Sequence, residues 1–160
     1  MTMSPPSARD PLGVHLSALR LLCELGWSFL STTECLSLRG STREPILKPR
    51  LVQFLQSRFF EYKGKRYPLS PLAVDHIARE LMALSLGNGL MAANERFYRM
   101  LSLGIPVTEF MPDGKKHQPV IALIDWTRPE ANRWEVTEHP AILSSQGTHH
   151  RTPDIVCYVN

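Results

Sequence analysis

The chain has 160 residues, 43% of them hydrophobic and 21% charged, which is enough for one globular domain with a core of its own. No apolar run approaches the length of a membrane span, and the N-terminus lacks the charged-then-apolar pattern of a secretory signal. The cysteines are odd in number and form no C-x-x-C pair, which argues against a disulfide framework or a zinc ribbon: Cys23, Cys35 and Cys157. A reducing cytoplasm is therefore the expected location.

The net charge of +3 is distributed unevenly along the chain. Between Arg39 and Arg66 there are eight basic and two acidic residues, a local charge of +6 that leaves −3 for the rest. Such a basic segment can contact the phosphates of a nucleic acid, and it can equally be a solvated face. The cations that we predict to face DNA are Arg50, Arg58, Lys63, Lys65 and Arg66.

The first part of the chain predicts helices. Asp10-Pro11 is a cap-then-proline start, and the first helix is expected to end near Gly26. Its apolar spacing predicts one inward face, with core anchors directly after it: Leu12, Leu16, Leu19, Cys23, then Trp27 and Phe29. The polar stretch Thr32–Thr42, which includes Cys35, is interpreted as a loop.

Three more helices are expected. The second covers Pro49–Phe60, with Leu51, Phe54, Leu55 and Phe59 inward, and a basic turn over Glu61–Leu69 follows it. The third begins at Ser70-Pro71 and ends near Gly87, with an inward stripe of Val74, Ile77, Leu81 and Leu84. The fourth covers Leu90–Leu103 and stops at Gly104, with a stripe of Leu90, Asn94, Phe97 and Leu101. Asn94 is predicted to be buried and hydrogen-bonded.

After Gly104 the pattern becomes extended. Two arms flank the turn Pro112–Lys115 and predict a β-hairpin, whose second arm contains the apolar run Val120–Ile124. Trp134–Glu138 alternates like a half-exposed strand, and Pro140–Thr152 is interpreted as a loop. The run Ile155–Val159 predicts a last strand buried on both faces.

The order of helices before strands predicts an α+β class, or α/β with a mixed sheet, in which N-terminal helices pack on that sheet. We expect one domain over residues 11–160 behind a disordered tail of residues 1–10.

Carboxylates at the ends of predicted strands are the main candidates for chemistry. Asp154 and Asp125, if brought together, could hold a hard cation such as Mg²⁺ through oxygen ligands. Aspartate also borders strands simply as a turn former. Glu109 and Glu138 are further candidates, and His149-His150 only weakly suggests a transition-metal site. The nucleotide-binding glycine motifs and the G-x-S-x-G serine motif do not occur in the sequence.

An ordered set of motifs then carries a resemblance to a known family. The set is Gly26-Trp27, Arg43-Glu44-Pro45-Ile46-Leu47, Ala93-Asn94-Glu95-Arg96-Phe97, Leu123-Ile124-Asp125-Trp126, Asn132 before Val136, and Thr152-Pro153-Asp154-Ile155-Val156-Cys157-Tyr158-Val159-Asn160. From about Leu12 onward the chain resembles the N-terminal domain of the restriction (R) subunit of type I restriction endonucleases.

The resemblance implies a restriction-endonuclease-like core of the P-D…(D/E)-x-K class, in a protein whose later portion is an ATP-driven DNA translocase. It implies that Asp154 binds Mg²⁺ and is catalytic, while a second acid and a lysine on the next strand complete the site. Those two residues are not in these 160, so we interpret the chain as incomplete at its C-terminal end and inactive by itself. The implied substrate is foreign double-stranded DNA, and the implied partners are the modification and specificity subunits. The alternative is a catalytically silent DNA-binding or assembly module with the same fold.

Overall fold

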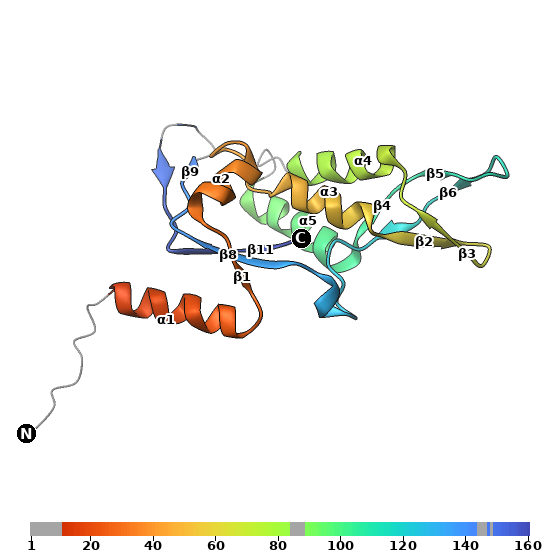
Figure 1. Cartoon of the computed structure of the whole chain (residues 1–160). Coiled ribbons are helices and arrows are strands. Elements are labelled where there is room, and N and C mark those ends of the chain that lie inside the picture. The colour runs from red at the N-terminus through yellow and green to blue at the C-terminus, as the bar shows by residue number, and fades with distance from the viewer. Residues whose placement is uncertain (1–10, 84–88, 144–146, 148) are drawn as a thin grey trace, which may run out of the picture. The chain divides into compact units, whose positions relative to one another are not determined.

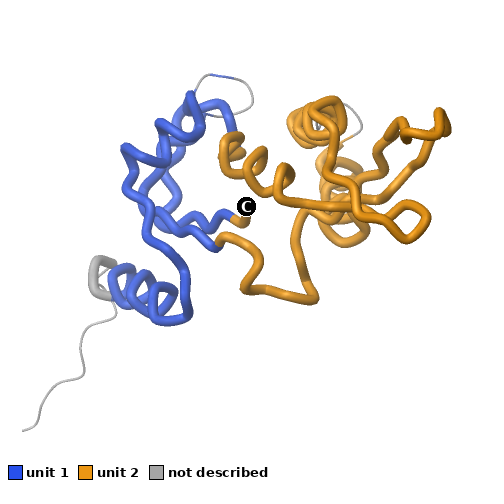
Figure 2. Tube along the Cα trace, turned by 45° about the vertical axis from the view of Figure 1, so that its right-hand side comes forward, with its two compact units in different colours: residues 1–45, 134–158 blue, residues 46–133, 159–160 orange. Residues whose placement is uncertain are grey.

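The computed structural model describes residues 11–83, 89–143, 147 and 149–160 (Figure 1). The chain divides into two compact units, shown in different colours in Figure 2. The first unit comprises Met1–Pro45 and Trp134–Tyr158, and the second comprises Ile46–Arg133 and Val159–Asn160. One domain over residues 11–160 stays a prediction, and the expected tail of residues 1–10 lies outside the described residues.

A three-stranded sheet is the centre of the first unit, in the order β1 (Ser28–Phe29), β8 (Trp134–Glu138), β11 (Ile155–Val159). β1 runs parallel to β8, with Ser28 opposite Glu135 and Phe29 opposite Val136. The middle of β8 is buried along three consecutive residues, so the predicted alternation along this strand is wrong. Burial on both faces is also wrong for β11, because this strand lies at the edge of the described sheet and its residues are half-buried or exposed.

The predicted loop over residues 140–152 contains a short antiparallel pair, β9 (Ile142–Leu143) with β10 (His150–Arg151). The β9–β10 pair is connected to the segment around Thr42, because the carbonyl of Thr42 accepts a hydrogen bond from the Leu143 amide at 3.0 Å.

Helix α1 covers Pro11–Glu24, and Gly26 follows it with a φ of 96°, as the sequence predicts. Its inward face differs from the prediction, because Leu16 is 59% exposed and Cys23 is exposed, whereas His15 and Leu19 are buried. Apolar residues lie on every side of this helix, so apolar spacing does not identify the buried face. After the helix Trp27 is half-buried, but Phe29 is 50% exposed and is not a core anchor.

Helix α2 covers Thr32–Arg39, where the sequence predicted a loop. The Ser31 hydroxyl accepts a hydrogen bond from the Glu34 amide at 3.2 Å, and Gly40 ends the helix with a φ of 77°. Cys35 is fully buried and donates from Sγ to the Tyr158 hydroxyl at 3.6 Å. The buried Arg39 guanidinium donates to three backbone carbonyls, those of Thr42, Glu44 and Ala141.

Helices α3 (Lys48–Gln56), α4 (Pro71–Met82) and α5 (Leu90–Leu103) belong to the second unit. The Ser70 hydroxyl caps α4 by accepting from the Ala73 amide, which confirms the predicted start. The predicted inward residues Leu51, Phe54, Leu55, Val74, Ile77 and Leu81 all lie in one buried cluster. Phe59 does not, because α3 ends at Gln56 and Phe59 opens a strand, where it is 51% exposed. Leu84 and the expected helix end near Gly87 lie outside the described residues.

Helix α5 has the predicted bounds, and of its predicted stripe Phe97 and Leu101 are partly buried against the core cluster whereas Leu90 and Asn94 are not. Asn94 is exposed and Leu90 is 72% exposed, whereas Met100 is buried. The prediction that Asn94 is buried is therefore wrong. Gly104 ends α5 with a φ of 84°, and a side chain there would lie 2.6 Å from the carbonyl oxygen of Ile121. Only glycine therefore allows the chain to turn from α5 directly into the next strand.

Three antiparallel pairs complete the second unit. They are β2 (Phe59–Tyr62) with β3 (Lys65–Pro68), β4 (Ile105–Pro106) with β7 (Val120–Ile121), and β5 (Glu109–Phe110) with β6 (Lys116–His117). The last two pairs form the predicted hairpin around the turn at Pro112–Lys115, and a 3₁₀ turn, η1, covers Pro129–Ala131. Helices with several small mixed sheets make an α+β fold, as predicted. Among the described helices, none is long and apolar enough to cross a membrane.

Candidate functional site

Asp154 lies directly before β11, and its side chain is exposed. Its carbonyl oxygen accepts a hydrogen bond from the His139 amide at 3.1 Å, which fixes the start of β11 beside the end of β8. Within the described part of the chain, its carboxylate has no ion pair or side-chain hydrogen bond. The backbone of Asp154 is therefore fixed, while its carboxylate is accessible to a ligand.

Glu138, another sequence candidate, lies at the end of β8, next to the residue that bonds Asp154. Its Oε2 atom lies 3.0 Å from the Nε2 atom of His15, within hydrogen-bond distance. Glu109 has a structural position, because it is buried and its Oε1 atom accepts from the Ser70 amide at 2.9 Å. His149 and His150 are exposed.

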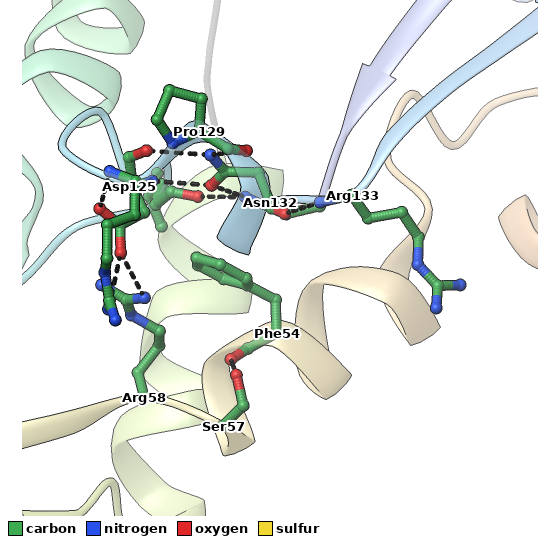
Figure 3. Close-up of polar contacts among 10 residues, drawn as sticks. Phe54, Ser57, Arg58, Asp125, Pro129, Asn132 and Arg133 are labelled. Atoms are coloured by element: carbon green, nitrogen blue, oxygen red, sulfur yellow. Dashed lines mark hydrogen bonds and ion pairs between the residues drawn. The ribbon is translucent and has the colours of Figure 1, made fainter. Parts of the chain in front are cut away.

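Asp125 is buried and held by two arginines, Arg58 and Arg128. Its contact with Arg58 is shown in Figure 3. Its Oδ2 atom accepts from Arg58 Nη1 at 3.0 Å and from Arg128 Nη2 at 3.1 Å, and its Oδ1 atom accepts from the Arg128 amide at 3.0 Å. These donors, Arg58 first, lower the pKa of the Asp125 carboxyl below its ordinary value. Both carboxylate oxygens of Asp125 therefore accept hydrogen bonds from the protein, and neither is available to bind a metal ion.

A network of amide side chains holds the backbone around Asp125 (Figure 3). Asn132 accepts from the Asp125 amide at 2.7 Å and donates to the Asp125 carbonyl at 2.9 Å. Asn160 donates to Asn132 Oδ1 at 3.0 Å and to the Leu123 carbonyl at 2.9 Å, and it accepts from the Arg133 amide at 2.8 Å. Because each buried polar atom in this network has a partner, the network fixes the loop and the last residue of the chain in one arrangement.

A cavity of about 230 Å³ lies next to this network in the second unit. It is lined by Arg50, Gln53, Phe54, Ser57, Ala131, Arg133 and Asn160. Sequence reasoning selected Arg50 but missed the other polar lining residues, since Gln53 and Ser57 become neighbours of Arg133 only through the fold. Two guanidinium groups in one cavity wall favour an anionic ligand such as a phosphate.

The predicted DNA-facing cations fall into different environments. Arg58 is the partner of Asp125 and also lies over the Phe54 ring, 5.1 Å from its centroid. Lys63 bonds Asp113 at 2.8 Å, and Arg66 lies over the Phe59 ring at 4.9 Å. Lys65 is exposed in the β2–β3 hairpin. The hairpin therefore presents Lys63, Lys65 and Arg66 outward, while Arg58 is part of the structure itself.

Comparison with protein families gives one result that covers nearly the whole chain. The family model described as "Type I restriction enzyme R protein N terminus" matches residues 14–160. A search of curated proteins finds no match. The matched range includes Asp154, Asp125 and the basic segment between Arg39 and Arg66.

Proposed function

The chain belongs to the family of type I restriction enzyme R protein N-termini, and on that premise we propose that it is the nuclease-domain portion of an R subunit. The complete protein would cleave foreign double-stranded DNA in an ATP-dependent reaction, together with modification and specificity subunits. The observation that carries this proposal is Asp154, a carboxylate at the start of β11 that the described residues leave open to a ligand.

The residues present fit one part of a magnesium site. Mg²⁺ prefers oxygen ligands and usually keeps several waters, so an exposed carboxylate with a fixed backbone is a suitable first ligand. Asp154 would hold the cation, which when bound supplies charge stabilisation to a phosphate under attack. Asp125 is not proposed as a ligand, since Arg58 and Arg128 already occupy its oxygens.

The second acid and the lysine of the P-D…(D/E)-x-K pattern would come from a strand that pairs with the outer edge of β11. This edge has no partner within the described residues, which leaves room for such a strand. The 160 residues by themselves are proposed to be inactive, because one carboxylate leaves most of the coordination to water. ATP would be used by a motor region outside these residues.

The exposed side of the β2–β3 hairpin is proposed to contact the DNA backbone. Lys63, Lys65 and Arg66 lie within four consecutive positions of its turn and second strand, so their positive charges are concentrated in one short exposed segment. Arg50 contributes from the cavity wall. Phosphate contacts of this kind position a duplex without reading its sequence.

The rival proposal is a catalytically silent DNA-binding or assembly module. Of the catalytic set, these 160 residues contain only Asp154, and this is also compatible with such a module. The sequence encoded directly after Asn160 separates the two. An acid-x-lysine on a β-prone segment supports the nuclease, whereas a stop codon at that point supports the silent module.

A further inference from the structure

Three side chains that can bind metals meet at the end of β8, in the first unit. They are His15 on α1, Glu138 at the last position of β8, and His139 directly after it. One ligand atom from each lies within 4.8 Å of the other two. We propose that these three residues form a site for a first-row transition metal such as Zn²⁺, separate from the magnesium ligand expected at Asp154.

The donor set decides the kind of metal. Two imidazoles and one carboxylate suit Zn²⁺ and its neighbours in the first transition row, whereas Mg²⁺ prefers oxygen ligands only. Zinc sites with three protein ligands of this kind take water as the fourth ligand. Asp154 offers oxygen alone, so the two positions differ in their preferred metals even though His139 is hydrogen-bonded to the Asp154 backbone.

The backbone that carries Glu138 and His139 is held from two sides. The Glu138 carbonyl accepts from the Thr32 hydroxyl at 2.9 Å, and the His139 amide donates to the Asp154 carbonyl at 3.1 Å. Pro140, the next residue, is fully buried. Between these anchors His139 adopts a φ of 44°, in the left-handed region that few residues other than glycine enter and in which His, like Asn and Asp, is over-represented. In this conformation the imidazole of His139 lies against that of His15.

His15 is the fixed member of the site. Its side chain is only 8% exposed, and its Nε2 atom already faces Glu138 Oε2 at 3.0 Å. Metal–ligand bonds of about 2.0–2.2 Å place tetrahedral ligands about 3.3–3.6 Å apart, so these two atoms need to separate by only a few tenths of an ångström to bind one zinc ion. A metal bound here would replace the direct hydrogen bond between these two atoms.

His139 is the member that has to move. Its ring is stacked on that of His15, with centroids 4.7 Å apart and planes inclined by 7°. A metal lies in the plane of each imidazole that binds it, so two parallel rings cannot both bind one ion. Because His139 is exposed, its ring can rotate out of the stack without displacing core residues. Binding of one ion by both imidazoles therefore requires that the His139 ring leave the stack.

Calorimetric titration of the chain with Zn²⁺ alone tests the proposal. It is done in a Cys23→Ser, Cys157→Ser background, because the thiols of these two residues are exposed and could bind zinc themselves. We expect one zinc ion per chain, with Co²⁺ as a spectroscopic probe of nitrogen ligation. Since loss of even an outer-shell partner costs about 10- to 100-fold in metal affinity, loss of a ligand is expected to weaken binding by at least about tenfold.

The informative variants are His139→Asn and Glu138→Gln, which preserve the fold better than removal of the buried His15. Asparagine tolerates the left-handed backbone, and glutamine can still bond His15. The matched control is His149→Ala with His150→Ala, two exposed histidines of the same unit. Asp154→Asn is expected to leave zinc binding unchanged. The proposal is overturned if the chain binds no zinc, or if zinc affinity is unchanged in both site variants; loss of binding in the His149/His150 control alone would place the ion elsewhere.

Discussion

Nη1 of Arg58 lies 3.0 Å from Oδ2 of Asp125, although 67 positions separate the two residues in the chain. The sequence presents Arg58 as a DNA-facing cation and Asp125 as a metal-binding carboxylate. In the fold each is the other's partner, with side chains only 23% and 7% exposed. The pair joins the end of α3 to the loop after β7.

Replacing either member of this pair is expected to destabilise the fold. Arg58→Ala and Asp125→Ala should each lower the thermal unfolding midpoint, because the remaining member keeps a charge with its main partner gone. Arg128→Ala is the control, since Arg128 binds the same carboxylate but is 65% exposed, and its effect should be clearly smaller. An Asp125→Ala chain as stable as the wild type would show that the pair does not hold the loop.

Asn132 is the amide whose loss should matter most. In Asn132→Leu the Asp125 amide and carbonyl and the Asn160 side chain are all left without this partner, so the expected cost is about 1–3 kcal/mol of unfolding free energy. Asn94→Leu is the matched control, because Asn94 is exposed and such substitutions usually stay within about 0.5 kcal/mol. Denaturant unfolding measures both. Equal effects of the two variants would mean that the network around Asn132 adds no stability.

Local chemistry in the sequence predicted several elements well. The bounds of α5 follow from apolar residues that end at Gly104, and the start of α4 follows from Ser70-Pro71. Helix α2 was missed, although Ser31 and Glu34 have the spacing of a capping box and Gly40 follows at the end. Apolar periodicity could not find it, because the residues that it buries are a cysteine and an arginine, Cys35 and Arg39.

The contact between two hairpin turns should respond to acid. Asp113, in the turn before β6, accepts hydrogen bonds from Lys63 at 2.8 Å and from the Tyr62 hydroxyl at 2.9 Å. These donors, Lys63 first, lower the pKa of the Asp113 carboxyl from 3.8 to about 2. A carboxyl whose pKa is lower in the folded state stabilises that state above its unfolded pKa and loses this contribution as the pH falls through the folded value.

We therefore expect the wild type to unfold at a higher temperature than Asp113→Asn above about pH 4, with the difference vanishing as the pH falls to about 2. Both charges are exposed, so added salt should shrink the difference. Thermal unfolding across this pH range measures it. A difference that is constant from pH 2 to pH 6 would show that ionisation of Asp113 plays no part.

The hairpin cations should govern DNA affinity. Replacing Lys63, Lys65 and Arg66 with alanine is expected to weaken duplex binding and to reduce the slope of log affinity against log salt by up to about 0.9 for each DNA phosphate that is no longer neutralised. The matched control replaces three arginines of α4 and α5: Arg79, Arg96 and Arg99. Fluorescence anisotropy with a labelled duplex gives both quantities. Equal slopes for the two triple variants would show that the hairpin cations are a solvated face and do not contact DNA.

Only part of the candidate site could be predicted from the sequence. Asp154 could be selected from the residues around it, because proline, aspartate and a β-prone run form a local pattern. Neither the Arg58–Asp125 pair nor the meeting of His15 with Glu138 has a local pattern, since their members lie 67 and 123 positions apart. Such contacts depend on how elements pack and cannot be derived from spacing along the chain.

DNA cleavage by the complete protein that we propose, an R subunit assembled with modification and specificity subunits, tests the central claim about Asp154 most directly. We expect Asp154→Ala to abolish cleavage in the presence of Mg²⁺ and ATP, while ATP hydrolysis and translocation continue. Asp75→Ala, which removes an exposed carboxylate of α4, should leave all three unchanged. Cleavage at the wild-type rate by the Asp154→Ala protein would contradict the assignment of Asp154 as the catalytic metal ligand.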